Sequence, residues 1–496
     1  MRKFLFHFVS QGKMWYIVFI EREKITFVGW LIMLVRFNVK NFLSFAGKLS
    51  EASKPLSSEE FSMIPGKVRS KEEHLFQNGP VPLLKFAAVY GANAAGKSNL
   101  IKAMAFFKNC SILGALPAGA SESYCKVDPA NKDRSSYFEM EIALDNVVYS
   151  YGFEVVLNSG RFVSEWLCRL SKNREPVCLF NKEGESSDYV FHGELESIKD
   201  LKVLVTSFSG SNSLFLSFIN RNMAGFYKTH PEASILNKVF SWIGNNLDIN
   251  FPANPLADSS FLANSESIAA ASRLLKAFGT GIECVEAVPL PVEKAFAALP
   301  PDLIKLVVAQ MENIAKNGIH ATDTVFIRTQ NGNGKDIFVI RHKKNDEMEA
   351  YSIQFKHAFK TSTLFKINEE SDGTARLFDL LEILLSKVNK TYVIDELDRC
   401  LHPSLSFEFV KAFFEYAKDR GVQLIVTTHE SRLMDFDLLR RDEIWFVDKK
   451  QSGESDIYSL EEFNERFDKK IDKAYLEGRY GGVPLFNSLF PVVKER

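Results

Sequence analysis

The sequence predicts an α/β fold in which a parallel sheet flanked by helices is joined to a β-meander. Two short segments, "YVIDE" and "VQLIVTTHE", are almost continuously apolar, which is typical of parallel strands buried on both faces. A third apolar segment, "LLKFAAVY", leads into a glycine-rich loop that opens a helix. Residues 136–170 alternate between apolar and polar side chains and carry turn signals at "DN" and "NSG". This alternation predicts about three antiparallel strands.

The composition indicates a globular protein with more than one folding unit. The chain has 496 residues, which is too long for one ordinary hydrophobic core. Its formal net charge of −1 provides no overall positive field to hold nucleic acid, although a local basic face is compatible with this total. The cysteines include no C-x-x-C pair, so we expect neither a zinc site nor a disulfide framework, and a cytoplasmic location fits best.

Residues 1–32 form an N-terminal extension of doubtful status. Its longest clean apolar stretch, "ITFVGWLIMLV", has only 11 residues and is too short to span a bilayer, so we expect no stable membrane insertion. We expect Met33 to be the real start, because "MLVRFNVKNFLSF" reads as an alternating strand from that residue. A genuine membrane-surface or partner-binding arm is the alternative.

The remaining chain divides into three parts. Residues 33–194 contain the glycine-rich loop and the meander, and residues 346–496 return to alternating helices and buried strands. Residues 195–345 have helical spacing with glycine and proline breaks and end in a hairpin around "NGNG". We therefore expect the middle part to be a mostly helical lobe inserted between the two halves of one α/β head.

The segment "GANAAGKSN" matches the P-loop pattern in full. Glycines allow backbone N–H groups to curl around a β-phosphate, and the helix N-terminus adds positive potential. Lys97 would reach the β- and γ-phosphates, and the Ser98 hydroxyl would bind Mg²⁺. A glycine turn that binds nothing is the alternative. The predicted nucleotide-binding residues are Gly91, Asn93, Ala94, Ala95, Gly96, Lys97, Ser98 and Asn99.

Two further strand ends carry candidate catalytic residues. "YVIDE" ends in Asp395, which would hold Mg²⁺, and Glu396, which would polarise the attacking water. "VQLIVTTHE" carries His429, which could hydrogen-bond the γ-phosphate. Ligands of open α/β sheets bind at the carboxyl ends of the strands. The alternatives are an acidic strand end that caps the next helix and a structural histidine.

The segment "ESDGTARLFDLL" places small polar residues before a helix. Ser371, Asp372, Gly373 and Thr374 would form a second helix N-terminus suited to an anion. An ordinary N-cap followed by a turn is the alternative.

In this order, the motifs resemble the ATP-binding-cassette branch of P-loop ATPases, and specifically its SMC-like group. The likeness covers roughly residues 33–170 and 345–450. It implies an ABC-type P-loop NTPase head, with ATP and Mg²⁺ as cofactors and ATP hydrolysis as the activity. In that group two heads sandwich two ATPs, so it also implies a homodimer or higher homo-oligomer. Ser371 to Thr374 would then act in trans as the signature, and "LDRCLHP" looks like the D-loop, with Asp398 facing the partner head.

A closer likeness concerns stand-alone bacterial AAA/ABC-type ATPases of abortive-infection and other anti-phage systems. "INEESDGTARLFDL", "IDELDRCLHP", "TTHESRLMD" and "GRYGGVPLF" are together similar to the ATPases of PARIS and Septu systems and to the OLD ATPase half. The likeness implies a switch that senses infection, through DNA or a phage protein, and controls a separate effector. The segment after His429 is too short for the Toprim nuclease domain of OLD proteins, so a nuclease effector would be another chain.

The sequence departs from the family pattern in places. The signature lacks the leucine-serine-glycine-glycine form of transporters, and Glu139 stands near the place of the usual Q-loop glutamine. The strand Lys40 to Phe45 lies where base-contacting residues often occur in such heads. A DNA repair or chromosome-maintenance ATPase of the SMC/RecF type is the main alternative function, and it predicts a basic groove and DNA-stimulated hydrolysis. A transporter subunit and a non-hydrolysing scaffold are the others.

Overall fold

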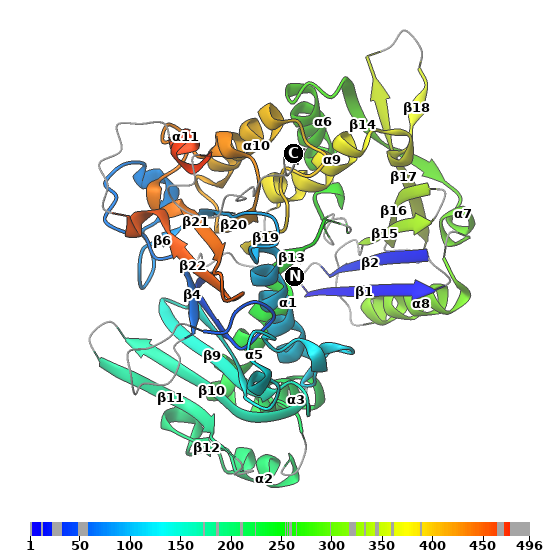
Figure 1. Cartoon of the computed structure of the whole chain (residues 1–496). Helices are drawn as coiled ribbons and strands as arrows, with labels where there is room; N and C mark the ends of the chain where they lie inside the picture. Colours follow the sequence, from blue (N-terminus) through cyan, green and yellow to red (C-terminus); the bar gives the residue numbers. More distant parts are fainter. Residues whose placement is uncertain are drawn as a thin grey trace, which may run out of the picture. The chain divides into compact units, whose positions relative to one another are not determined.

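The computed structural model divides the chain into two compact units (Figure 1), and each is described by itself. Unit 1 comprises Met1–Gly29, Asn250–Val388 and Asp398–Arg420, and unit 2 comprises Trp30–Ile249, Asn389–Leu397 and Gly421–Arg496. The predicted lobe of residues 195–345 is therefore shared between the units, and the predicted domain division stays a prediction. The structure describes residues 2–10, 13–21, 32–47, 58–171, 174–184, 188–208, 212–223, 225–252, 254, 256, 260–263, 265–297, 299–316, 324–331, 334–342, 347–358, 362–386, 389–463 and 471–476.

The first sheet of unit 2 carries the glycine-rich loop. Its strand order is β13-β19-β20-β7-β21-β22. Strand β7 lies between β20 and β21 and is parallel to both, and β19 is parallel to β20. All residues of β7, β19 and β20 are buried, as their continuous apolar sequences predicted. The strands are β7 (Phe86–Tyr90), β13 (Leu247–Asn250), β19 (Lys390–Ile394), β20 (Val422–Thr427), β21 (Ile444–Lys449) and β22 (Ser455–Ser459).

The second sheet of unit 2 is the predicted meander, extended at both ends. Its order is β12-β11-β10-β9-β8-β3-β4. The β8–β9 turn is formed by Asp145 and Asn146, with φ of 49° and 63°, as a two-residue hairpin turn requires. The strands are β3 (Met33–Lys40), β4 (Glu59–Ser62), β8 (Ser136–Leu144), β9 (Val147–Val156), β10 (Arg161–Ser171), β11 (Arg174–Lys182) and β12 (Val190–Phe191). A two-stranded sheet, β5 (Leu75–Phe76) with β6 (Leu83–Leu84), completes the described strands of this unit.

An aromatic core joins the meander to α1 (Lys97–Leu113), the helix that follows the glycine-rich loop. The Phe107 ring stacks on Phe153, with centroids 5.7 Å apart, and meets Phe37 and Tyr151 edge-on. All four side chains are completely buried. The meander therefore fixes α1, and with it the end of the glycine-rich loop.

The other helices of unit 2 are short. A fully buried carboxylate anchors one of them, because Glu165 of β10 accepts hydrogen bonds from the hydroxyls of Tyr151 and Tyr189 and from the N–H groups of Phe215 and Leu216. The helices are α2 (Lys199–Phe208), α3 (Phe215–Asn222), α4 (Phe226–Thr229), α5 (Ser234–Ser241) and α11 (Ile471–Leu476), with a π-helical turn at Trp242–Asn246.

A disulfide links Cys168 of β10 to Cys178 of β11, two residues that face each other across the strands. The sequence contains no C-x-x-C pair, which predicts no disulfide framework, so this single disulfide was not expected. The pairing arises from the register of two strands joined by a hairpin, which cysteine spacing alone does not reveal.

Unit 1 is built on one antiparallel sheet covered by helices. Its order is β1-β2-β15-β16-β17-β14, with β18 paired to β17. The predicted "NGNG" hairpin is present as β15 and β16. The strands are β1 (Arg2–Ser10), β2 (Lys13–Glu21), β14 (Ile282–Leu290), β15 (Thr324–Asn331), β16 (Gly334–His342), β17 (Met348–His357) and β18 (Leu364–Phe365). The helices are α6 (Ser265–Ala277), α7 (Val292–Phe296), α8 (Pro301–Lys316), α9 (Asp372–Leu385) and α10 (Pro403–Ala417).

Two features of this sheet were not expected. The strands β1 and β2 pair antiparallel with each other, and β2 pairs with β15 over seven residues, Thr324 to Gln330. Two strands of the N-terminal extension are thus part of a sheet, while a start at Met33 stays a prediction. The lobe expected to be mostly helical also contains β14, whose sequence "IECVEAVPL" pairs with β17. Among the described helices, none is both long and apolar enough to cross a bilayer.

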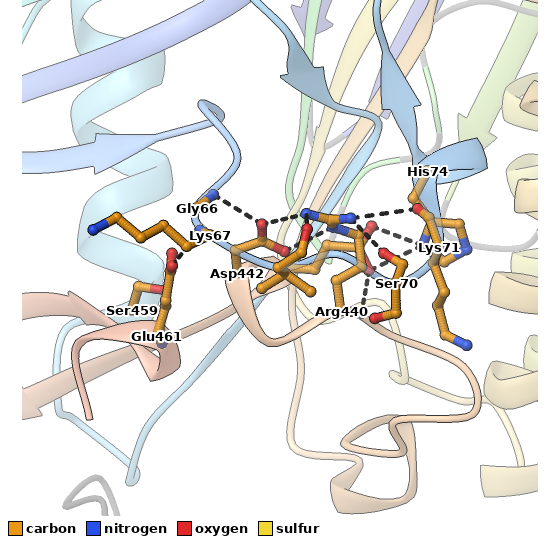
Figure 2. A network of polar contacts seen from close by, with 11 residues as sticks. Gly66, Lys67, Ser70, Lys71, His74, Arg440, Asp442, Ser459 and Glu461 are labelled. Carbon is orange, nitrogen blue, oxygen red and sulfur yellow. Dashed lines mark hydrogen bonds and ion pairs between the residues drawn. The ribbon is translucent and has the colours of Figure 1, made fainter. Parts of the chain in front are cut away.

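A buried polar network fixes the proline-broken excursion between β4 and β5 to the turn before β21 (Figure 2). The Arg440 guanidinium, 1% exposed, forms a two-pronged contact with Asp442 and donates to the carbonyl oxygens of Val68 and Ser70. Asp442 in turn accepts from the N–H of Gly66. Nearby, His74 Nδ1 lies 2.9 Å from the Glu443 carboxylate, and both side chains are buried.

The His74–Glu443 pair is expected to make stability depend on pH. Burial raises the pKa of Glu443 well above its ordinary value, and burial lowers the pKa of His74 to about 4. At pH values between the lowered pKa of His74 and the raised pKa of Glu443, the folded pair holds one proton. In the unfolded chain Glu443 is already ionised near neutral pH, and His74 loses its proton as the pH rises through about 6.5. Unfolding at higher pH then releases a proton, so the free energy of unfolding is expected to fall as the pH rises above about 6.5, until Glu443 itself deprotonates.

Urea unfolding at pH 7 and pH 8 checks this slope. Glu443→Gln keeps a side chain that can bond His74 but carries no titrating proton, so the wild type should lose stability relative to this variant between pH 7 and pH 8. Parallel pH profiles for the two proteins would show that the pair holds no proton in this range.

Candidate nucleotide-binding site

The glycine-rich loop connects the end of β7 to the start of α1, as predicted. Gly96 has a φ of +120°, and a Cβ added there would lie 2.7 Å from Ser455 Oγ and 2.8 Å from Ser44 Oγ. A Cβ on Gly91 would lie 2.3 Å from the Val447 carbonyl oxygen. At both positions the neighbouring chain lies too close to leave room for a side chain, so glycine is required. At Gly96 the backbone conformation also requires glycine.

Lys97 lies across this loop. Its ammonium donates to the carbonyl oxygens of Gly91 at 2.7 Å and Ala92 at 3.1 Å, and the side chain is 6% exposed. The positive charge thus sits at the N-terminus of a 17-residue helix, where the backbone N–H groups of the first turn also point. This combination favours an anion, and a polyphosphate fits it.

Ser98 and Asp395 are brought together from residues nearly 300 positions apart. Ser98 Oγ donates to Asp395 Oδ1 at 3.1 Å, and Thr427 Oγ1 donates to the same oxygen at 2.6 Å. Asp395 is 4% exposed. A hydroxyl and a carboxylate are hard oxygen donors of the kind that Mg²⁺ takes together with substrate phosphates. The residues present therefore fit the predicted metal, and no cluster of three or more His, Cys, Asp or Glu side chains that could hold a metal occurs among the described residues.

Glu396 follows directly and adopts an unusual backbone. Its φ is +52°, in the left-handed region that residues other than glycine rarely occupy. Its N–H donates to Thr427 Oγ1 at 2.8 Å, and the next N–H, of Leu397, donates to the Thr427 carbonyl oxygen. Thr427 therefore holds both acidic residues in place. Conformations of this kind concentrate at functional sites, where the surroundings enforce them.

His429 lies two residues beyond β20, at the same edge of the sheet. Thr427 pairs with Val89 of the parallel strand β7, and the Thr428 N–H donates to the Val89 carbonyl oxygen. The carboxyl ends of β7 and β20 are thus level. The glycine-rich loop follows β7, His429 follows β20, and the two acids follow β19, which is the other neighbour of β20. The His429 side chain is exposed.

The predicted signature and the D-loop from Asp398 onward belong to unit 1, where they contact each other. Ser371 is the N-cap of α9, and its Oγ accepts from the Thr374 N–H at 3.1 Å. A Cβ on Gly373 would lie 2.7 Å from the Cys400 carbonyl oxygen, so the D-loop packs against the start of α9. Asp372 is exposed. The main-chain carbonyl oxygen of Asp398 accepts from the Leu401 N–H in the turn that contains Cys400. The capping role is therefore present, and action in trans stays a prediction.

Sequence reasoning missed several residues of the site. Thr427, Ser44 and Ser455 hold the acids and the loop, yet Ser455 lies in a turn-rich stretch with no recognisable pattern. Ser44 does fall in the Lys40 to Phe45 segment that we flagged for base contacts. Glu139, flagged near the Q-loop position, accepts from Asn38, Ser150 and Trp166 on the meander, which gives it a structural role there.

Residues 86–435, more than half of the chain, match the family model described as "AAA domain, putative AbiEii toxin, Type IV TA system". The chain belongs to this AAA-domain family. Membership agrees with the observed strand, P-loop and helix, and the predicted α/β head with a β-meander beside a parallel sheet is confirmed. The coarse class predicted from the motifs, a P-loop ATPase of the AAA type, is confirmed too. No curated protein matches the chain.

Solved structures similar to this member of the AAA-domain family include SMC heads. An SmcHead bound to the C-winged helix domain of ScpA is 17% identical, with 86% of this chain and 97% of that chain covered and a TM-score of 0.36. The SMC head domain from Thermotoga maritima is 14% identical, with 86% and 98% covered and a TM-score of 0.35. An Smc head domain with an extended coiled coil, bound to the C-terminal domain of ScpA derived from Pyrococcus furiosus, is 16% identical, with 90% and 99% covered and a TM-score of 0.35.

Proposed function

We propose that the protein binds and hydrolyses ATP as the molecular switch of an anti-phage, abortive-infection defence system. The observation that carries the ATPase part is the hydrogen bond between Ser98 of a complete P-loop and Asp395, which directly follows the buried strand β19. The description of the family, which names a toxin of a toxin–antitoxin system, supports the defence part. The expected place of action is the cytoplasm, where ATP is available.

The residues divide the chemistry between them. Backbone N–H groups of the loop and the Lys97 ammonium would bind the β- and γ-phosphates of ATP. Ser98 and Asp395 would hold Mg²⁺, which supplies neutralisation of phosphate charge when bound. Glu396 would accept a proton from the water that attacks the γ-phosphate, and His429 would hydrogen-bond that phosphate. Products are ADP and phosphate.

Switching would come from assembly around ATP. Ser371 to Thr374 of one copy would cap the nucleotide held by the P-loop of another, with Asp398 at the same junction, in a homodimer or a larger homo-oligomer. ATP at 100 times its dissociation constant would favour the bound state by about 2.7 kcal/mol per site. This is enough to shift a balanced equilibrium between two arrangements. The assembly would respond to DNA or a phage protein and control a separate effector, a nuclease encoded nearby.

Two measurements test the proposed ATP hydrolysis and the proposed role in defence separately. Purified protein should release phosphate from ATP, and removal of Mg²⁺ with a chelator should stop the release. The intact locus, neighbouring genes included, should lower the plating efficiency of at least one phage in a panel, and Glu396→Gln in the same locus should remove that protection. Turnover without any phage response, but stimulated by DNA, would instead support a DNA repair ATPase.

A further inference from the structure

We propose that Ser455 positions the phosphate-binding loop, by fixing the peptide between Ala95 and Gly96 so that the Gly96 N–H faces the phosphates. The inference rests on the proposed binding of ATP and assigns a role to the far end of the chain. Ser455 is the first residue of β22, is 1% exposed, and donates from its hydroxyl to the Ala95 carbonyl oxygen at 2.5 Å. Ala95 is the residue before the second glycine of the P-loop pattern.

The geometry of the peptide bond gives this contact its consequence. In a trans peptide the carbonyl oxygen and the following N–H point in opposite directions, and the described chain contains no cis peptide. The Ala95 carbonyl points outward, to Ser455. The Gly96 N–H therefore points the other way, away from Ser455. That N–H is one of the donors that a phosphate would meet at the start of α1.

Ser455 is itself held by a second serine. Its N–H donates to the Ser44 carbonyl oxygen at 2.8 Å, and Ser44 Oγ accepts from the Asn99 side chain at 2.9 Å. Asn99 lies in the first turn of α1, two residues after Lys97. We call Ser44, Ser455 and Asn99 the serine brace. It joins the segment after β3, the start of β22 and both sides of the P-loop's second glycine.

The brace lies directly against Gly96. The two serine hydroxyls stand 2.7 and 2.8 Å from where a Cβ of that residue would be. Because Ser455 is buried, loss of its hydroxyl would leave the Ala95 carbonyl without this donor. The peptide would then be free to rotate. Phosphate binding would have to restore its orientation, and this ordering would reduce the net free energy of binding.

The experiment compares nucleotide affinity in wild type, Ser455→Ala and Ser455→Thr by calorimetry with ADP and with AMP. Loss of one hydrogen bond that orders the loop should raise the dissociation constant for ADP about 5- to 12-fold. AMP lacks the β-phosphate that the loop would bind, so the affinity for AMP should differ little between the wild type and Ser455→Ala. Ser455→Thr keeps the hydroxyl and should restore most of the affinity for ADP.

A serine at the other end of the same strand is the matched control. Ser459 is also buried, but its Oγ accepts from the Glu461 N–H, away from the loop. Ser459→Ala should bind ADP like the wild type. If Ser455→Ala fails to fold, Ser44→Ala tests the brace from the other serine, with an expected loss for ADP but not for AMP.

The outcomes separate this inference from the proposed function. If the wild type binds ADP tightly and both Ser455→Ala and Ser44→Ala bind it equally well, the brace has no positioning role while the nucleotide site stands. Equal losses for ADP and AMP would point to general destabilisation and would also overturn it. Wild-type protein that binds neither ADP nor ATP would overturn the proposed function itself.

Discussion

Replacing Lys97 by alanine is expected to weaken ATP binding by about 10- to 150-fold and to abolish turnover. The ammonium is buried over the loop and would form charge-assisted hydrogen bonds with the phosphates, each worth about 1.5–3 kcal/mol. Its removal leaves the phosphate charge unneutralised at the place where the reaction needs it most. Calorimetry with a slowly hydrolysed ATP analogue measures the affinity, and phosphate release measures the turnover.

Lys102 offers a control on the same helix. It is exposed and lies five residues further along α1, so Lys102→Ala removes the same charge from the helix without touching the loop. We expect near wild-type affinity in this variant. Unchanged ATP affinity in Lys97→Ala, with Lys102→Ala behaving identically, would refute the assignment of residues 91–98 as a phosphate-binding loop.

Replacing Glu396 by glutamine is expected to leave ATP binding intact and to slow hydrolysis by about 10²- to 10⁴-fold, the usual contribution of a general base. The backbone contacts of Glu396 with Thr427 involve main-chain N–H groups and are retained by glutamine. The variant should therefore bind ATP without consuming it and accumulate the assembled form. Light scattering with and without ATP measures the assembly.

A second substitution distinguishes trans capping from simple N-capping. Ser371 caps α9 in unit 1, and Ser371→Arg in the Glu396→Gln background should prevent ATP-dependent assembly while each copy still binds ATP. If the double variant assembles as well as Glu396→Gln alone, Ser371 to Thr374 do no more than cap their helix. If Glu396→Gln turns over ATP at the wild-type rate, the catalytic base lies elsewhere.

Local patterns in the sequence predicted the parts of the structure that depend on neighbouring residues. The continuous apolar runs of β7, β19 and β20, the alternation of the meander and the spacing of the P-loop each reflect a periodicity within one element. The site residues Lys97, Ser98, Asp395 and Glu396 could be found in the same way, because phosphate and Mg²⁺ chemistry demands fixed residue types at fixed spacing.

Features that depend on distant pairing could not be predicted. The hydrogen bond from Ser455 to Ala95 joins residues 360 positions apart, and the His74–Glu443 contact joins residues 369 apart. The partner of β2 proved to be β15, and the whole of Trp30–Ile249 of unit 2 lies between these two strands in the sequence. Serine, histidine and glutamate carry no signal of a partner in their own neighbourhood. Only the register of the sheets decides which of them meet.

The strand order of the nucleotide sheet has a consequence for how the protein is made. Strand β7 finds its two parallel neighbours only when β20 and β21, residues 422–427 and 444–449, have been synthesised. At about 5–20 residues per second a ribosome needs roughly 20–70 s to cover that interval. Throughout this time the P-loop sequence exists without the sheet that shapes it. A nascent chain therefore acquires its nucleotide site late in translation, so unfinished chains are expected to be inactive as ATPases even though they already contain Lys97 and Ser98.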